Sequence, residues 1–238
     1  MNKFTLAAIA VILISFGGLV LWSSLNNKSE VDLKKYDPVR VIPASNENDN
    51  MSDHVRGKAD AKVVVVEYGD FTCPGCASMA PKMDLLYKQY GDRVAFIYRN
   101  FSVGHTNSLT GIAAGQSAAR QGYFWEMERA LFGNQSSWIA EKGEARTQAF
   151  VKLFKQAAPK GDEDKFKRDL ADPSIMKKPN FDKMIGSKLQ NISQTPSFLI
   201  NGTHIEINEK NTDKSLTQII EEAINKELKA KGLETGAK

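Results

Sequence analysis

The stretch Val63-Val-Val-Val-Glu67-Tyr-Gly-Asp-Phe-Thr-Cys73-Pro-Gly-Cys76 places both cysteines shortly after a run of valines. Its β-branched run is too short for a helix and predicts a buried strand. Gly69-Asp70-Phe71-Thr72 ends that strand, and apolar residues recur at helical spacing from Cys76 to Tyr90. Both cysteines therefore belong to a junction between a strand and a helix.

The pattern continues on the C-terminal side of this junction. Residues 93–98 alternate as a second strand, and residues 106–191 are almost entirely helical in their periodicity. A predicted hairpin joins residues 197–200 to residues 203–207, and residues 216–228 form a strong amphipathic helix. The order β-α-β, helices, β-β-α predicts an α/β fold with a helical block inserted in its middle.

The N-terminal part of the chain predicts export. After a short flank, residues 1–3, an uncharged apolar run covers residues 4–22. Such a helix rises about 28 Å, close to the roughly 30 Å of a bilayer core. The run is longer than a usual signal core, and no clear small-x-small cleavage site follows it, so a single-pass transmembrane anchor is predicted. A cleaved signal peptide is the alternative, and both interpretations place the domain on the extracytoplasmic side of the cell membrane.

Composition sets the other boundaries. Polar residues together with Pro38 and Pro43 predict a flexible tether over residues 23–54. A single domain over residues 55–228 follows, and the Lys/Gly/Glu-rich tail, residues 229–238, is expected to be frayed.

Overall composition excludes several classes of protein. The 238 residues are 42% hydrophobic and 25% charged, which rules out wholesale disorder, collagen and a polytopic membrane protein. The net charge of +4 comes from dispersed basic residues, whereas a nucleic-acid surface needs clustered ones, so we expect no nucleic-acid partner. Two cysteines are too few for a disulfide-stapled scaffold.

The spacing of Cys73 and Cys76 predicts redox chemistry. The first thiol would lie at a helix N-terminus, where unpaired N–H groups and the helix dipole stabilise the nucleophilic thiolate. The second thiol would be more buried and would resolve a mixed disulfide. Glu67 is placed to accept the proton of that buried thiol, through water and with a raised pKa. A solvent-facing charge on an edge strand is the alternative for Glu67.

A third element is Thr195–Pro196, directly before a predicted strand. A proline there is a candidate cis bond, and its loop can expose backbone groups that pair with an extended substrate. Without the cysteines, this dipeptide would indicate an ordinary turn. For the cysteine pair itself, the alternatives are a metal site completed by His54, His105 or His204, and an inert disulfide.

Taken together, these residues resemble the DsbA-like thiol–disulfide oxidoreductases of the thioredoxin superfamily. The resemblance covers about Arg56 to Leu228 and implies a thioredoxin fold with an inserted helical subdomain, here preceded by the predicted transmembrane helix. The motifs that carry it are Glu67–Cys76, Thr195–Gly202, Gly57–Ala61, Arg99–Phe101 with His105, Gly122–Met127 and Leu131–Gln135.

The resemblance also implies a role for each matching residue. Cys73 matches the attacking cysteine and Cys76 the resolving one. Glu67 matches the buried acid. Pro196 matches the cis-proline, and Thr195 before it is expected to contact substrate.

Two positions depart from the pattern of the family. Pro74 and Gly75 match the dipeptide that tunes the reduction potential and faces substrate, but DsbA itself has a histidine where this chain has Gly75. The usual Gly-Thr-Pro of the family here begins with Gln194. Both differences leave the reduction potential open without affecting the dithiol chemistry. His105 and Trp125 match family positions too, and a structural role is expected for both.

We therefore expect an extracytoplasmic thiol oxidase that introduces disulfides into exported proteins at Cys73 and Cys76, with no cofactor and no metal. The expected partners are reduced or unfolded exported proteins and, as the resemblance implies, a membrane quinone-linked protein that reoxidises the pair. We expect a monomer. The alternatives are a reductase or isomerase with the same residues, a tethered metal-binding module, and a structural domain that has kept the motif.

Overall fold

The computed structural model describes most of the chain. Within the described residues, no helix is long and apolar enough to cross a bilayer. The predicted anchor, residues 4–22, and His105 lie outside them, so what was expected of both stays a prediction. The described segments are residues 31–104, 107–206 and 214–236.

The structure separates into two compact units, Met1–Lys35 and Tyr36–Lys238. The described part of the first unit contains a short 3-10 turn, η1 (Leu33–Lys35). The second unit carries the sheet and both cysteines.

Five strands form one mixed sheet in the second unit: β1 (His54–Gly57), β2 (Val63–Gly69), β3 (Val94–Asn100), β4 (Ser197–Ile200) and β5 (Thr203–Ile205). Their order across the sheet is β1-β3-β2-β4-β5. β2 and β3 run parallel, and every other neighbouring pair is antiparallel. The return strand predicted over residues 203–207 is present as β5, and the last of those residues lies outside the described part of the chain. A strand that was not predicted, β1, forms one edge of the sheet.

β2 lies in the middle of this sheet, and all of its residues are buried. Glu67 lies opposite Tyr98 of β3 on one side and Phe198 of β4 on the other. The alternative of a solvent-facing acid on an edge strand is therefore wrong, because neighbouring strands flank Glu67 on both sides.

β1 was not predicted from the sequence, because this strand is short and its polar residues show no alternation of hydrophobic and polar positions. It pairs with the outer edge of β3. Gly57 ends the strand with a φ of 86°, and a Cβ atom there would lie only 2.3 Å from the carbonyl oxygen of Val94. The position therefore requires glycine.

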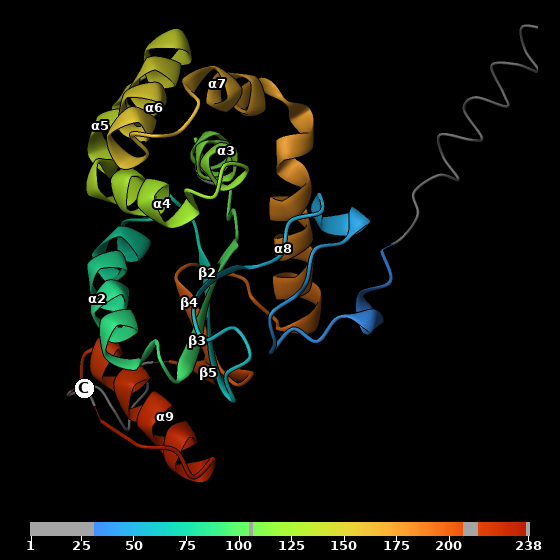
Figure 1. Ribbon diagram of the computed structural model, residues 1–238, viewed down its shortest axis with the longest axis vertical. Coiled ribbons are helices and arrows are strands. Elements are labelled where there is room, and N and C mark those ends of the chain that lie inside the picture. Colours follow the sequence, from blue (N-terminus) through green and yellow to red (C-terminus); the bar gives the residue numbers. More distant parts are fainter. Residues whose placement is uncertain (1–30, 105–106, 207–213, 237–238) are drawn as a thin grey trace, which may run out of the picture. The chain divides into compact units, whose positions relative to one another are not determined.

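Helices cover both faces of the sheet (Figure 1). On one face lie α2 (Pro74–Tyr90) and α9 (Leu216–Ala230), while α8 (Lys177–Leu189) contacts β3 on the other. Because side chains alternate along a strand, Val65 belongs to the hydrophobic core under α2 and α9, whereas Val64 belongs to the opposite one. β2 is thus anchored from both sides.

The helical block predicted over residues 106–191 lies between β3 and β4. Its core includes Trp138 and Phe150, and Phe71, from the loop before Cys73, packs into the same cluster. The helical block and that loop therefore share one hydrophobic core. The elements of the block are α3 (Ser108–Ala119), α4 (Phe124–Gly133), α5 (Gln135–Ala140), α6 (Gly143–Ala157), α7 (Glu163–Ala171), η3 (Pro173–Met176) and α8.

The prediction of a flexible tether over residues 23–54 is wrong from Tyr36 onward. A 3-10 turn, η2 (Asn46–Asn48), packs against α8, and the side chain of Ile42 is fully buried. The ring of Tyr36 meets the ring of Phe181 edge to face, with centroids 4.8 Å apart. This segment is therefore part of the domain.

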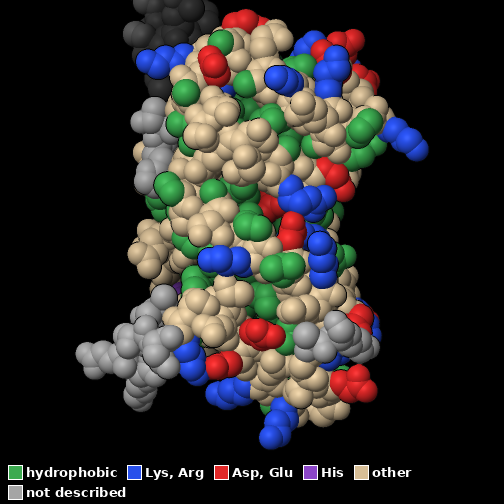
Figure 2. Space-filling model, turned by 90° about the vertical axis from the view of Figure 1, so that its left-hand side faces the viewer, with side chains coloured by type: hydrophobic (Ala, Val, Ile, Leu, Met, Phe, Trp, Pro, Cys, Tyr) green, Lys and Arg blue, Asp and Glu red, His purple; other side chains and the backbone are tan. Residues whose placement is uncertain are grey.

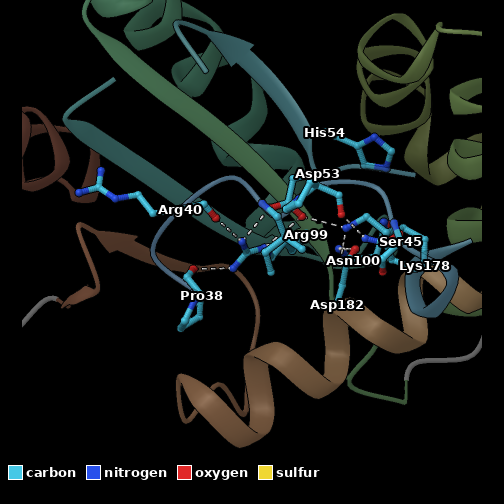
Figure 3. A network of polar contacts seen from close by, with 12 residues as sticks. Pro38, Arg40, Ser45, Asp53, His54, Arg99, Asn100, Lys178 and Asp182 are labelled. Atoms are coloured by element: carbon cyan, nitrogen blue, oxygen red, sulfur yellow. Dashed lines mark hydrogen bonds and ion pairs between the residues drawn. The ribbon is translucent and has the colours of Figure 1, made fainter. Parts of the chain in front are cut away.

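A buried ion network holds this segment in place (Figure 3). The polar composition of the segment alone could not reveal these contacts. Asp53 Oδ2 accepts hydrogen bonds from Arg99 Nη2 at 2.7 Å and from the backbone N–H of Ile42 at 2.9 Å. Asp53 Oδ1 accepts from Lys178 Nζ at 2.9 Å, and Lys178 also pairs with Asp182. Arg99 further donates to two carbonyl groups of the segment, those of Pro38 and Arg40.

The prediction of a frayed tail is also wrong, as far as residue 236. Leu233 packs on the core under α9. Arg93 Nη1 donates to the carbonyl of Glu234 at 2.7 Å, and the backbone N–H of Gly236 donates to Asn225 Oδ1 at 2.7 Å. These contacts hold the tail against α9 and the turn before β3.

Candidate active site

Both cysteines lie at the junction between β2 and α2. Cys73 is the N-cap residue of α2, and Pro74 is its first helical residue, a position where proline fits because its missing N–H would be unpaired anyway. The side chain of Cys76 is fully buried, Cys73 is nearly so, and Pro74 and Gly75 are exposed. Both thiols are free. Partners can therefore approach from the side of Pro74 and Gly75.

The two thiols have opposite acidities. A hydrogen bond with the Cys76 side chain, helped by the backbone N–H groups of Cys76 and Gly75, lowers the pKa of Cys73 to about 5 despite partial burial. The same hydrogen bond, burial and the charge of Glu67 raise the pKa of Cys76 well above its ordinary value. At neutral pH, Cys73 is the thiolate and Cys76 keeps its proton.

Glu67 lies beneath this pair as a buried acid. Burial, followed by the repulsion of the Glu128 carboxylate, raises the pKa of Glu67 to about 8. Its Oε1 has no hydrogen-bond partner among the described residues. Glu67 is therefore mostly protonated at neutral pH, as an acid that exchanges a proton with a buried thiol must be.

The fold brings Thr195 and Pro196 next to the cysteines. Their peptide bond is cis, and the thiol of Cys73 lies 3.3 Å from the carbonyl oxygen of Thr195. A Cβ atom at Gly75 would lie 3.0 Å from Pro196 Cδ and 3.6 Å from Cys73 Sγ. A side chain at position 75 would therefore press on the proline ring, and this chain avoids that contact by having glycine there.

The residues that hold this loop in place were not predicted from the sequence. Asp70 is fully buried, and its carboxylate accepts hydrogen bonds from both the backbone and the hydroxyl of Thr72 and from Ser108 Oγ at 2.6 Å. Gln135 Nε2 donates to the carbonyl groups of Phe71 and Cys73, at 2.8 and 3.0 Å. An aspartate two residues before threonine is a local turn signal, but no local signal links Gln135 to the cysteines.

Glu128 is a further missed residue. It lies on α4, is buried, and burial raises its pKa to about 7. The sequence analysis assigned this helix by its apolar positions, and an acid among them gives no sign of which strand it faces.

Neither of the described histidines, His54 and His204, offers a third ligand for the metal-site alternative. Among the described residues, no three His, Cys, Asp or Glu side chains come close enough to hold a metal ion. His54 stacks on Phe124 with ring centroids 3.6 Å apart, and burial lowers its pKa to about 3. His204 Nε2 lies 2.8 Å from the carbonyl of Gln190. Trp125 Nε1 donates to the carbonyl of Val55 at 3.3 Å.

A groove of about 580 Å³ lies beside the cis-proline. Its lining is largely polar: Ser193, Gln194 and Ser197 come from the cis-proline loop and the start of β4, and His204 comes from β5. The residues on either side of Thr195–Pro196 thus line this groove.

Comparison with known proteins agrees with this geometry. The model of the thioredoxin family matches residues 49–222, more than half of the chain. The chain belongs to the thioredoxin family. This thioredoxin-family chain is 32% identical over 183 residues to the probable disulfide bond formation protein D of Bacillus cereus, with 73% of this chain and 77% of that protein aligned.

The fold is also similar to that of a solved structure. The crystal structure of oxidised BdbD from Bacillus subtilis superposes with a TM-score of 0.63 at 25% identity, over 80% of this chain and 98% of that one. The predicted thioredoxin fold with a helical insertion is therefore confirmed, and so, at the level of the family, is a thiol–disulfide oxidoreductase.

A second group of relatives is much longer than this thioredoxin-family chain. An 85-residue segment is 41% identical to the Na(+)/H(+) antiporter NhaA 1 of Mycolicibacterium vanbaalenii. That alignment covers 35% of this chain but only 14% of the antiporter.

Proposed function

We propose that this chain is an extracytoplasmic thiol oxidase that passes a disulfide from Cys73 and Cys76 to exported proteins. The observation that supports this most is the contrast between the two thiols. Cys73 has a strongly lowered pKa beside the cis-proline loop, whereas Cys76 is buried above a protonatable acid. A thiolate stabilised in this way favours the reduced form of the enzyme, and that makes its disulfide oxidising.

The proposed exchange balances electrons and protons as follows. A substrate thiolate attacks Cys73 Sγ of the oxidised pair, the bond between the cysteines breaks, and Cys76 leaves and takes a proton from Glu67. The second thiolate of the substrate then attacks the substrate sulfur bonded to Cys73. The substrate gains one disulfide, two electrons pass to the enzyme, and Cys73 leaves as a stable thiolate.

The polar groove beside Pro196 is the proposed site for the substrate chain. An extended segment there can pair with the backbone of the cis-proline loop while its cysteine reaches Cys73. Thr195, Pro74 and Gly75 are the proposed contacts around the reacting sulfur. Because these groups are mainly backbone and small polar side chains, the site suits unfolded chains of varied sequence.

The cellular setting is also part of the proposal. The apolar run of residues 4–22 supports export and an anchor in the cell membrane, with the domain on the extracytoplasmic side. Disulfides persist in that environment. The reduced pair is then reoxidised by a membrane partner that accepts two electrons, for which we propose a quinone-linked protein.

A single-turnover assay tests this function. We expect the oxidised full-length protein, mixed with an equimolar amount of a reduced unfolded protein that has two cysteines, to convert it to its disulfide form. Each enzyme chain should transfer one disulfide and end with two free thiols, counted by alkylation and mass spectrometry. The same enzyme with both thiols alkylated is the control. Failure to transfer a disulfide, or net reduction of a substrate disulfide by the reduced protein, would contradict the proposal.

A further inference from the structure

Four buried polar atoms gather beneath Cys76 without a hydrogen-bond partner in the described part of the chain. They are Glu67 Oε1, Tyr98 OH, Glu128 Oε2 and Arg56 Nε. Each comes from a different element, namely β2, β3, α4 and β1. Buried polar groups in native proteins bond to protein or to ordered water. These four atoms therefore form a polar cluster beside the active site, and two of them belong to buried acids.

The two acids influence each other. The charge of Glu128 is one of the causes that raise the pKa of Glu67, second only to burial. Both side chains are more than nine-tenths buried. Tyr98 lies opposite Glu67 in the sheet, and its ring lies 5.6 Å from that of Phe124 and 6.5 Å from that of Phe132, the residues one turn before and one turn after Glu128 on α4. Burial raises the pKa of Tyr98 well above its ordinary value, so it stays neutral. The two carboxyl groups share one buried, low-dielectric environment.

A groove opens at the surface within one helical turn of Glu128. Phe132 lies one turn after Glu128 on the same face of α4, and Phe132 and Arg129 line a groove of about 290 Å³ between α4 and α2. Asp84 of α2 lines the same groove and pairs with Arg56. Figure 2 shows the side of the molecule that carries α2 and α4, where acidic and basic side chains are interspersed among hydrophobic ones.

From this geometry we infer that Glu128 is a second acid of the active site, which acts through Glu67. Its carboxyl group keeps Glu67 protonated near neutral pH and relays the proton of Cys76 between Glu67 and the groove between α2 and α4. Glu128 is thus a positioning residue for that proton, since it does not touch the reacting sulfurs. The inference rests on the proposed function.

The step that depends on Glu128 is closure of the enzyme disulfide. When the reduced enzyme meets glutathione disulfide, the Cys73 thiolate attacks it, forms a mixed disulfide and releases one glutathione thiolate. Cys76 then gives its proton to the Glu67 carboxylate and attacks Cys73 Sγ, which expels the second glutathione thiolate. Glu67 passes the proton on through Glu128. The enzyme loses two electrons, and glutathione disulfide gains them.

The charged groups around Glu67 and Glu128 determine whether removing Glu128 raises or lowers the pKa of Glu67. Arg56 lowers the pKa of both acids, Arg129 lowers that of Glu128, and Asp84 raises it. With Glu128 removed, Glu67 loses a like charge and keeps its cation. The pKa of Glu67 must therefore fall, and closure must begin at lower pH.

The test follows closure of the mixed disulfide by acid quench and mass spectrometry between pH 5 and pH 9.5, in the full-length protein. We expect the rate in the wild type to rise with pH as Glu67 ionises, with an inflection above the ordinary carboxyl range because burial and Glu128 raise the pKa of Glu67. Glu128→Gln should lower that inflection by roughly one pH unit. At pH 9.5, where Glu67 is ionised in both proteins, closure should be about tenfold slower in Glu128→Gln, as general acid–base effects of this size are common.

Controls separate the possible outcomes. Glu141→Gln changes an exposed glutamate and should leave the profile unchanged, and Glu128→Asp should restore part of it. Thermal unfolding shows whether each variant is folded. An unchanged inflection in folded Glu128→Gln overturns the inference. A lowered inflection with an unchanged rate at pH 9.5 overturns the route through the groove and retains the coupling of the acids. If no mixed disulfide forms at Cys73 in the wild type, the proposed function fails before this step.

Discussion

Cys73→Ser is expected to reduce disulfide exchange to the uncatalysed rate. The nucleophile in this chemistry is a thiolate, and a serine hydroxyl neither ionises near neutral pH nor forms a disulfide. Cys76 cannot replace it, because its side chain is fully buried and burial and its hydrogen bond to Cys73 hold its pKa far above neutral. The measurement is the rate of disulfide transfer to a reduced two-cysteine protein.

Cys76→Ser is the matched variant for this prediction. It keeps the attacking thiol and loses the resolving one, so it should form a mixed disulfide at Cys73 that persists. Mass spectrometry of the trapped species identifies the cysteine that carries the substrate. A mixed disulfide in folded Cys73→Ser, formed at Cys76 at a rate like that of the wild type, would show that the two roles are assigned the wrong way round.

Asp53→Asn is expected to destabilise the domain by about 3–5 kcal/mol, the usual cost of removing one partner from a buried ion pair. Asp53 accepts hydrogen bonds from Arg99, Lys178 and the backbone of Ile42 in an environment closed to solvent. Without its charge, both cations lose a buried partner. Denaturant titration of the full-length protein measures the change in the free energy of unfolding.

The stability that Asp53→Asn loses should depend on pH. Burial raises the pKa of Asp53, but the charges of Lys178 and Arg99 outweigh it and hold the pKa well below its ordinary value. An acid with a lowered pKa stabilises the fold above its unfolded pKa of about 3.9, and this contribution disappears as the pH falls. The difference between the wild type and Asp53→Asn should therefore shrink below about pH 4.

Asp60→Asn is the control for this second prediction, because Asp60 is exposed. Its free energy of unfolding should stay within about 0.5 kcal/mol of the wild type. If Asp53→Asn were as stable as Asp60→Asn, the ion network would not be what holds residues 36–53 against the sheet.

Local sequence patterns predicted most of the fold and about half of the candidate site. The valine run of β2, the cysteines at the start of α2 and the proline before β4 each have a signature within a few residues. Glu67 could also be predicted as a site residue, because an acid within a run of buried valines is unusual.

The remaining features depend on contacts between distant segments. The tether prediction failed because polar composition indicates a linker unless a buried partner is known, and Arg99 and Lys178 lie 46 and 125 residues from Asp53. Gln135 and Glu128 face the site across the junction of the helical block with the sheet. No periodicity in a single helix reveals which strand its polar residue meets.

The reduction potential of the Cys73–Cys76 pair distinguishes an oxidase from a reductase. It is measured by equilibrating the full-length protein with glutathione redox buffers and counting free thiols after alkylation. We expect a value of about −120 mV, the strongly oxidising end of the thioredoxin superfamily, because the Cys73 thiolate stabilises the reduced form. A value of about −270 mV, like that of thioredoxin, would contradict it and make the protein a reductase.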